Sequence, residues 1–171
     1  NARCSESGCV LSAMTSRMIV VEPGVLEFVA PPNILPQTAS IRLTNLSNVC
    51  VAYKIKTTNP KRYCVRPNTG LILAAPRMVE VTVTYLPSDR VVPPANLKDK
   101  FQIVSTAVPS PEIQDHIERQ LPNKNAFIEE MRKLWREIPS DRIVQEKMKV
   151  VFTERTLHTP LHTTMQPGTT P

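Results

Sequence analysis

Proline is the residue that most restricts what this chain can fold into, because 17 of its 171 residues are Pro and only 4 are Gly. Proline is tolerated at strand entries, edge strands and turns, but poorly inside helices or central strands. Because the prolines punctuate short runs of Val, Ile and Leu between residues 18 and 104, they favour an all-β domain with stiff connections. The same apolar runs argue against a disordered proline-rich linker, and the length suits one domain.

The apolar runs have the alternation of β-strands, and turn residues such as Pro23-Gly24 separate them. Strands are expected at 18–23, 25–31, 39–45, 49–57, 63–67, 78–86, 100–108 and 145–153. Residues 67–70 (PNTG) are expected to form a turn, and the last strand is expected to close a sheet edge. Seven or so short strands, with turns about every eight to twelve residues, indicate a β-sandwich.

Two segments near the end of the chain change from strand alternation to helical spacing. Residues 110–121 are expected to form a short helix. Residues 123–138 place six apolar side chains on one stripe of a helix that Pro139 ends. The stripe is expected to pack on the sandwich; the alternative is that it binds in the groove of a partner.

The two ends of the sequence lack this organisation. Residues 1–16 show no period and are expected to form a flexible leader. Residues 155–171 are rich in Thr and Pro and are expected to form a disordered tail. The folded domain is therefore expected to span residues 17–154.

A basic stretch lies in the middle of the chain, where no Asp or Glu occurs between Glu27 and Glu80. Its cations are Arg42, Lys54, Lys56, Lys61, Arg62, Arg66 and Arg77. Alternation in the strand 49–57 places Lys54 and Lys56 on the same face as Ala52. The opposite face carries Val49, Val51, Tyr53 and Ile55. A positive field of this kind attracts acidic partners, but composition alone leaves a solvated sheet face equally open.

The sequence carries no pattern of catalysis, metal binding or cofactor binding. The cysteines, Cys4, Cys9, Cys50 and Cys64, form no C-x-x-C pair and are expected to be reduced thiols in the cytosol. His158 and His162 have helical metal-ligand spacing, but Pro160 would interrupt the helix. With 4 Gly and no phosphate-binding loop, we expect neither an enzyme nor a cofactor.

Nucleic-acid binding is also not expected, although the sequence pI is near 9.4. Proteins that bind single strands place exposed aromatic rings along a basic groove. Aromatic residues make up only 5% of this chain, and Tyr63 is the one candidate for a stacking surface.

The residues of the basic stretch resemble a known family. VAYKIKTTNPKRYCVRPNTG (51–70), with LEF upstream and KDKF downstream, closely resembles the major sperm protein (MSP) domain of the VAMP-associated protein (VAP) family. The resemblance extends over roughly 18–153 and includes LWREIPSDRIVQEKMKVVF near its end. It implies a seven-stranded immunoglobulin-like β-sandwich with one or two short helices before the last strand.

The resemblance also implies a function. The domain would be an adaptor on the cytosolic face of the endoplasmic reticulum. There it would dock short acidic FFAT-type peptides (two phenylalanines in an acidic tract) of lipid-transfer and tethering proteins at membrane contact sites. Family members usually have a coiled coil and a membrane anchor. The chain has no apolar run of about 18 residues or more, so an anchor, and any homodimer contact of this type, would lie outside this sequence.

The resemblance implies eight peptide-binding residues, taken from its K-x-K-T-T, R-P-N and K-F segments. They are Lys54, Lys56, Thr57, Thr58, Arg66, Asn68, Lys100 and Gln102. Plainer interpretations stay open: Lys56 as a solvated strand lysine, and Thr57 and Thr58 as turn formers. The same segments also predict core residues, which are Tyr53, Cys64, Val65 and Phe101, and make Pro67 a turn residue that is a candidate for the cis form.

Two features depart from the family pattern. Gln102 stands where the family usually has Met or Leu as an apolar wall for a peptide ring, and burying an amide there has a desolvation cost. Residues 108–126 are longer and more helical than the usual connection. The alternative function is a self-assembling structural protein of the nematode major sperm protein type, but the K-x-K-T-T and R-P-N segments favour peptide docking.

Overall fold

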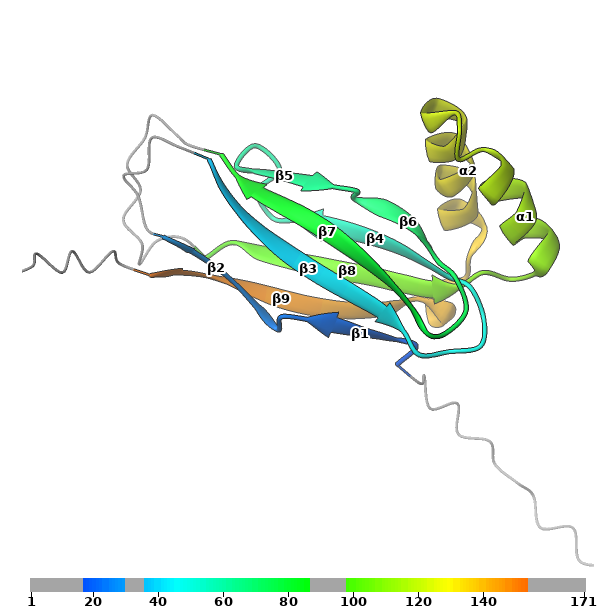
Figure 1. Ribbon diagram of the computed structural model, residues 1–171, viewed down its shortest axis with the longest axis horizontal. Coiled ribbons are helices and arrows are strands. Elements are labelled where there is room, and N and C mark those ends of the chain that lie inside the picture. Colours follow the sequence, from blue (N-terminus) through cyan, green and yellow to red (C-terminus); the bar gives the residue numbers. More distant parts are fainter. Residues whose placement is uncertain (1–16, 30–35, 87–97, 154–171) are drawn as a thin grey trace, which may run out of the picture.

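The protein is a two-layer β-sandwich with a helical hairpin at one end, and its computed structural model describes residues 17–29, 36–86 and 98–153 (Figure 1). One sheet contains, in spatial order, β1 (Ile19–Glu22), β3 (Gln37–Asn45), β7 (Arg77–Tyr85) and β5 (Tyr63–Arg66). The other contains β2 (Val25–Val29), β9 (Val144–Thr153), β8 (Lys100–Ala107), β4 (Val51–Thr57) and β6 (Thr69–Ile72). The predicted all-β, immunoglobulin-like sandwich is confirmed.

The described residues form nine strands rather than seven, and two pairs of consecutive strands are separated by a Pro-Xaa step at which the chain passes to the other sheet. It passes from β1 to β2 at Pro23 and from β5 to β6 at Pro67, and both prolines follow cis peptide bonds. The prediction of a turn over 67–70 was wrong at its end, since Thr69 and Gly70 already pair with Lys54 and Tyr53 on β4.

Gly70 explains why β6 was hard to predict. A Cβ atom at this position would lie 2.9 Å from ring atoms of Tyr53, so only glycine lets the two strands approach this closely. The sequence shows Gly70 next to Pro67 and Asn68, which is the composition of a turn. Packing against Tyr53 therefore selects a residue that looks like a loop former.

The main core lies between the sheets and contains the inward-facing residues of the strands. Val51, Tyr53 and Ile55 are buried there as expected, and Phe101 is 1% exposed. Five rings gather at one end with centroid separations of 5.0 to 6.1 Å: Phe28, Tyr63, Tyr85, Phe101 and Phe152. Burial of this apolar surface, at about 25 cal/mol per Å², is the main stabilising term of the sandwich.

Three details of the strand predictions were wrong. Val49 lies before β4 and is 41% exposed. Cys64 is only half-buried, on the edge strand β5, whereas Val65 packs against the main core as predicted. The last strand, β9, does not close an edge either: it lies between β8 and β2, and it pairs with β2 in parallel.

The two predicted helices form the hairpin. α1 (Pro111–Arg119) begins after Ser110, whose side chain accepts a hydrogen bond from the Ile113 amide. α2 (Lys124–Glu137) ends at Ile138, just before Pro139, and a 3-10 turn (Ser140–Arg142) leads into β9. Five residues of the hairpin and the strand end before it bury a second core against Cys50 and Ala52: Val108, Ile117, Met131, Leu134 and Ile138. The apolar stripe therefore packs on the sandwich, as predicted.

The predicted leader (1–16) and tail (155–171) lie outside the described residues, as do His158 and His162. The limits 17–154 of the domain stay a prediction.

Candidate functional site

Lysines gather on the outer face of the five-stranded sheet, the face turned away from the other sheet. The strand register brings Lys56 of β4 opposite Gln102 of β8, and Gln102 opposite Lys147 of β9. Two residues before Gln102 on β8, Lys100 lies opposite Lys149 of β9. Since alternate residues of a strand share a face, four lysines from three strands lie on one surface.

A shallow hollow of about 340 Å³ lies among these lysines, and we call it the lysine groove. It is lined by Lys56, Thr57, Thr58, Lys100, Phe101, Gln102 and Lys147. Five of the eight predicted peptide-binding residues therefore surround one hollow. Three cationic side chains at its rim and apolar stems along its walls fit an anionic ligand with an apolar portion.

The two threonines that line the groove are held by hydrogen bonds. The Thr58 amide donates to the Lys100 carbonyl oxygen at 3.0 Å, and the Lys100 amide donates to Thr58 Oγ1 at 3.0 Å. The Asn59 amide donates to Thr57 Oγ1 at 3.2 Å. Turn chemistry thus accounts for both hydroxyls, and the same bonds tie the end of β4 to the start of β8. The threonines therefore fix the ends of the two strands that carry Lys56 and Lys100.

Gln102 lies in the wall of the groove, where the resemblance implies an apolar residue. Its Nε2 donates a hydrogen bond of 2.7 Å to Gln145 Oε1 on β9. Because the amide already has a protein partner, a ligand ring can pack on the aliphatic part of Gln102 without breaking that hydrogen bond. The expected desolvation cost is therefore smaller than an unpaired amide would impose.

Lys54 and Asn68 lie at a second, neighbouring hollow between β4, the start of β6 and α2. This hollow also measures about 340 Å³, and we call it the Trp135 hollow. It is lined by Lys54, Asn68, Thr69, Ile128, Met131, Arg132 and Trp135. Arg66 lines neither hollow: it ends β5 in the other sheet and is exposed. The structure therefore groups seven of the eight predicted residues into two adjoining hollows and leaves Arg66 apart.

Sequence reasoning missed Lys147, Arg132 and Trp135. Alternation in residues 145–153 marks Lys147 as outward-facing, but only the register between β8 and β9 shows that it reaches the groove. Arg132 and Trp135 belong to a helix whose apolar stripe was expected to pack on the sandwich or to bind in the groove of a partner, and neither expectation indicates a hollow beside the helix.

Arg62 belongs to the basic stretch but is not free to bind a ligand. Its Nη1 pairs with Asp99 Oδ2 at 2.6 Å, and Tyr63 donates its hydroxyl to the same oxygen at 2.9 Å. Burial and the contact with the Asp99 carboxylate raise the pKa of Tyr63. This network ties the start of β5 to the residue before β8, so Arg62 is structural.

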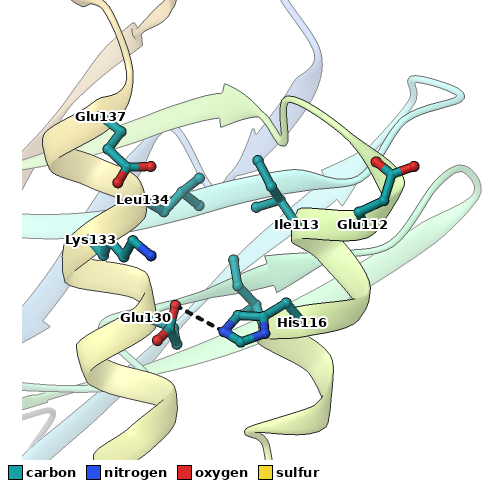
Figure 2. A pocket seen from close by; sticks show the side chains of 8 residues that line it. Glu112, Ile113, His116, Glu130, Lys133, Leu134 and Glu137 are labelled. Atoms are coloured by element: carbon teal, nitrogen blue, oxygen red, sulfur yellow. Dashed lines mark ion pairs between the residues drawn. The ribbon is translucent and has the colours of Figure 1, made fainter.

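A third hollow, of about 310 Å³, lies between α1 and α2 (Figure 2). Figure 2 shows Ile113 and Leu134 between the two helices, with Glu112 and Glu137 at one end of the slot. At the other end His116 Nε2 lies 3.3 Å from Glu130 Oε2. Its rim carries three Glu and one Lys, so its charge is opposite to that of the lysine groove.

Two further findings concern the described residues only. They contain no group of three or more His, Cys, Asp or Glu side chains that could hold a metal ion. None of their helices is both long enough and apolar enough to cross a membrane.

Comparison with known proteins identifies the family that the sequence resembles. The family model of the MSP (Major sperm protein) domain matches residues 18–126. Vesicle-associated membrane protein-associated protein A of Rattus norvegicus is 32% identical over 135 residues, which are 79% of this chain and 47% of that protein. The vesicle-associated membrane protein/synaptobrevin-binding protein of Aplysia californica is 32% identical over 141 residues, 82% of this chain and 47% of that protein.

A plant protein is similar in sequence, and a solved nematode structure is similar in fold. Vesicle-associated protein 1-3 of Arabidopsis thaliana is 35% identical over 114 residues, 66% of this chain and 46% of that protein. The solved structure of WR4, a C. elegans MSP family member, superposes with a TM-score of 0.52 at 22% identity, covering 80% of this chain and 98% of WR4. The chain spans less than half the length of the curated relatives named here. It belongs to the VAMP-associated protein family and carries that family's MSP domain.

Proposed function

We propose that this domain is a peptide-docking adaptor that binds short acidic FFAT-type peptides in the lysine groove. The observation that carries the proposal is the convergence of Lys56, Lys100 and Lys147, from three strands, on one hollow with apolar walls. An acidic tract would be steered to this face by its positive field, in a step that salt weakens. A peptide ring would then lie in the groove against the stems of the lysines and Gln102.

The energetics require both parts of the peptide. Exposed ion pairs contribute only about 0.2–1 kcal/mol each, so three lysines alone give weak binding. Burial of an aromatic ring and hydrogen bonds to the peptide backbone supply the remainder. The expected affinity is micromolar, about −8 kcal/mol.

The proposal extends to the cellular role that the family suggests. The domain recruits lipid-transfer and tethering proteins to the cytosolic face of the endoplasmic reticulum at membrane contact sites, and it has no enzymatic activity of its own. The membership of the chain in the VAMP-associated protein family supports this role.

Calorimetric titration with an acidic FFAT-type peptide tests the docking proposal. The wild type is expected to bind one peptide at micromolar concentration, and Lys56→Asp combined with Lys100→Asp is expected to abolish binding. Absence of saturable binding at moderate salt would refute the proposal. A Gln102→Met variant is expected to bind somewhat more tightly, because it offers the ring an apolar stem without an amide to desolvate.

Sedimentation of the same samples distinguishes peptide docking from the alternative function, a self-assembling structural protein. A self-assembling protein of the major sperm protein type would sediment as a reversible polymer at high concentration, whether or not an acidic peptide is present.

A further inference from the structure

β6 forms an open edge of the five-stranded sheet, because β4 is the only strand of the described residues that pairs with it. The Ile55 amide donates to the Asn68 carbonyl oxygen at 2.8 Å, one residue before β6 begins. In an antiparallel ladder, every second residue exchanges backbone hydrogen bonds with the partner strand. Gly70 and Ile72 therefore direct their backbone N–H and C=O groups toward β4.

The residues that alternate with them, Thr69 and Leu71, direct their backbone groups away from β4, toward the open side. No other described segment forms a backbone hydrogen bond with these two residues. A row of unpaired backbone groups at a sheet edge is a template for pairing with a further extended chain. The edge of β6 therefore has the hydrogen-bonding groups that strand addition requires.

A hollow of about 400 Å³, which we call the β6 hollow, lies along this edge, since three of the four residues of β6 line it. Leu73 and Val79 line it from the sandwich, and Leu121 and Phe127 line it from the helical hairpin. The open edge therefore lies between two apolar walls, one from each side of the sheet.

The two walls determine which side chains an added strand would need. On β6 itself, Ile72 belongs to the main core and Leu71 packs against the second core beneath the hairpin. A strand added beside β6 would alternate its side chains in the same way, between the sandwich wall and the hairpin wall. Since both walls are apolar, the segment that fits carries consecutive apolar residues.

Exposed leucines at the hollow support an apolar ligand. Leu73, just after β6, is 41% exposed, and Leu121, in the turn between α1 and α2, is 59% exposed. Removing such surface from water is favourable, and adjoining exposed apolar side chains commonly mark an interaction site.

Glu118 is the one charged residue that lines the β6 hollow. Its Oε1 accepts a hydrogen bond of 2.8 Å from Gln114 Nε2, but it has no ion-pair partner among the residues that the structure describes. Its carboxylate therefore favours a ligand that carries a Lys or Arg beside its apolar residues.

The position of the edge favours a peptide over the sheet of a second copy. The hairpin extends past β6 on one side of the sheet, and β7 lies on the other side. A folded sandwich that approached edge to edge would bring its own second layer against one of these walls. A single extended segment fits between them.

From these observations we infer that the edge of β6 is a second peptide-binding site, which binds an extended apolar segment with a neighbouring Lys or Arg. The segment would become a further strand of the five-stranded sheet. The site is separate from the lysine groove, and its ligand has the opposite charge, so the inference does not rest on the proposed docking of acidic peptides.

The test uses the peptide Gly-Lys-Val-Leu-Val-Lys-Gly, blocked at both ends, and amide hydrogen exchange of the ¹⁵N-labelled protein. At saturating peptide we expect exchange to slow about fivefold or more at Thr69 and Leu71, whose N–H groups gain partners. Gly70 and Ile72 already donate to β4, so their exchange should slow less. The contrast between neighbouring amides of one strand is the signature of strand addition.

Two control peptides separate the backbone from the side chains. One carries a methyl group on the nitrogen of each of its three apolar residues, so it keeps the side chains but cannot donate hydrogen bonds there. The other has three Ser in place of Val-Leu-Val and keeps both charges. Neither is expected to protect Thr69 or Leu71.

Two exposed leucines provide the matched pair of variants. Leu121→Asn removes apolar surface from the β6 hollow and is expected to weaken binding of the peptide about fivefold. Leu46→Asn changes a leucine that is 61% exposed but does not line the hollow, and it should change the affinity less than about twofold. Equal losses in the two variants would mean that the peptide binds apolar surface without selecting this site.

Two charge variants test the role of Glu118. Glu118→Gln is expected to weaken binding about threefold, the range of one partly exposed ion pair. Glu112→Gln removes an exposed carboxylate from the same helix outside the β6 hollow and should leave the affinity within about 1.5-fold. Equal effects would show that the peptide responds to net charge alone.

Three results of the exchange experiment would overturn strand addition. They are no protection of Thr69 and Leu71, equal protection by the methylated peptide, and protection confined to amides of the lysine groove such as Gln102. Slow exchange at Thr69 and Leu71 without peptide, deepening as the protein concentration rises, would assign the edge to a second copy and overturn the peptide site. None of these results bears on whether acidic peptides bind in the lysine groove.

Discussion

The outer side of β4 has two halves with opposite surroundings. Ala52 is 0% exposed beneath the helical hairpin, whereas Lys56, four residues further along the same side, is exposed at the lysine groove. Small side chains, Cys50 and Ala52, let the hairpin approach the sheet. Long charged side chains keep the rest of the face open, because their heads stay in water. One strand therefore serves as core at one end and as binding surface at the other.

The test with the largest expected effect places a lysine at Ala52, in the half of β4 that the hairpin covers; we call this the covered half and the half with Lys56 the open half. Ala52→Lys would bury an ammonium group against the apolar side chains of Ile117, Met131 and Leu134. We expect the free energy of unfolding to fall by about 4 kcal/mol or more, through overpacking and the desolvation of the charge. Urea unfolding measures the change, and Lys56→Ala in the open half serves as the control with an expected change within about 0.5 kcal/mol. Similar unfolding midpoints for the two variants would show that the halves do not differ.

A second test removes apolar contacts from the hairpin and leaves the groove untouched. Ile117 is 1% exposed on α1, and Ile117→Ala is expected to lower the free energy of unfolding by about 3 kcal/mol. The affinity of an acidic peptide for the lysine groove, measured at a temperature where the variant is folded, should stay within about twofold. A parallel loss of affinity would mean that the hairpin and the groove form one cooperative unit.

The sequence predicts the covered half better than the open half. The helical stripe, its end at Pro139 and the strands of the main core follow from local periodicity, which depends on neighbouring residues only. The strand β6 was not predicted, because Gly70 looks like a turn residue in the sequence. Its role is the close approach to Tyr53, a contact between residues 17 positions apart.

The candidate site depends on pairing between distant segments. That Lys147 reaches the groove follows from the register of β8 with β9, whose paired positions Gln102–Lys147 and Lys100–Lys149 are 45 and 49 residues apart in the sequence. The removal of Arg62 from the basic surface follows from Asp99, 37 residues away. Neither is visible in local patterns, so the resemblance to a family was needed to identify the face, and the structure to identify its members.

A third test uses pH and the thiol beneath the hairpin. Burial, and secondarily the charge of Glu118, raises the pKa of Cys50 from 9.0 to about 11. The unfolded chain therefore loses this proton first, so the stabilisation is present below pH 9 and decreases as pH rises toward 11. We expect the free energy of unfolding to fall by about 1 kcal/mol between pH 9 and pH 10 because of this group.

The control for the pH test is Cys50→Ala, which removes the titrating group. Its unfolding free energy should change less over the same interval, and the difference in slope between the two proteins is the measured quantity. Equal slopes would mean that the hairpin does not hold the thiol away from water.

The smallest expected effect belongs to the open half and concerns binding rather than stability. Lys147→Ala removes one rim charge of the lysine groove and is expected to weaken binding of an acidic peptide about three- to fivefold, the range of one exposed ion pair. The free energy of unfolding should change by less than about 0.5 kcal/mol, because Lys147 is exposed. Lys133→Ala, which removes an exposed lysine from the slot between α1 and α2, lowers the net charge equally and should change the affinity less than twofold. If both variants weaken binding to the same extent, the affinity depends on the net charge of the domain. The lysine groove would then not be the binding site of the acidic peptide.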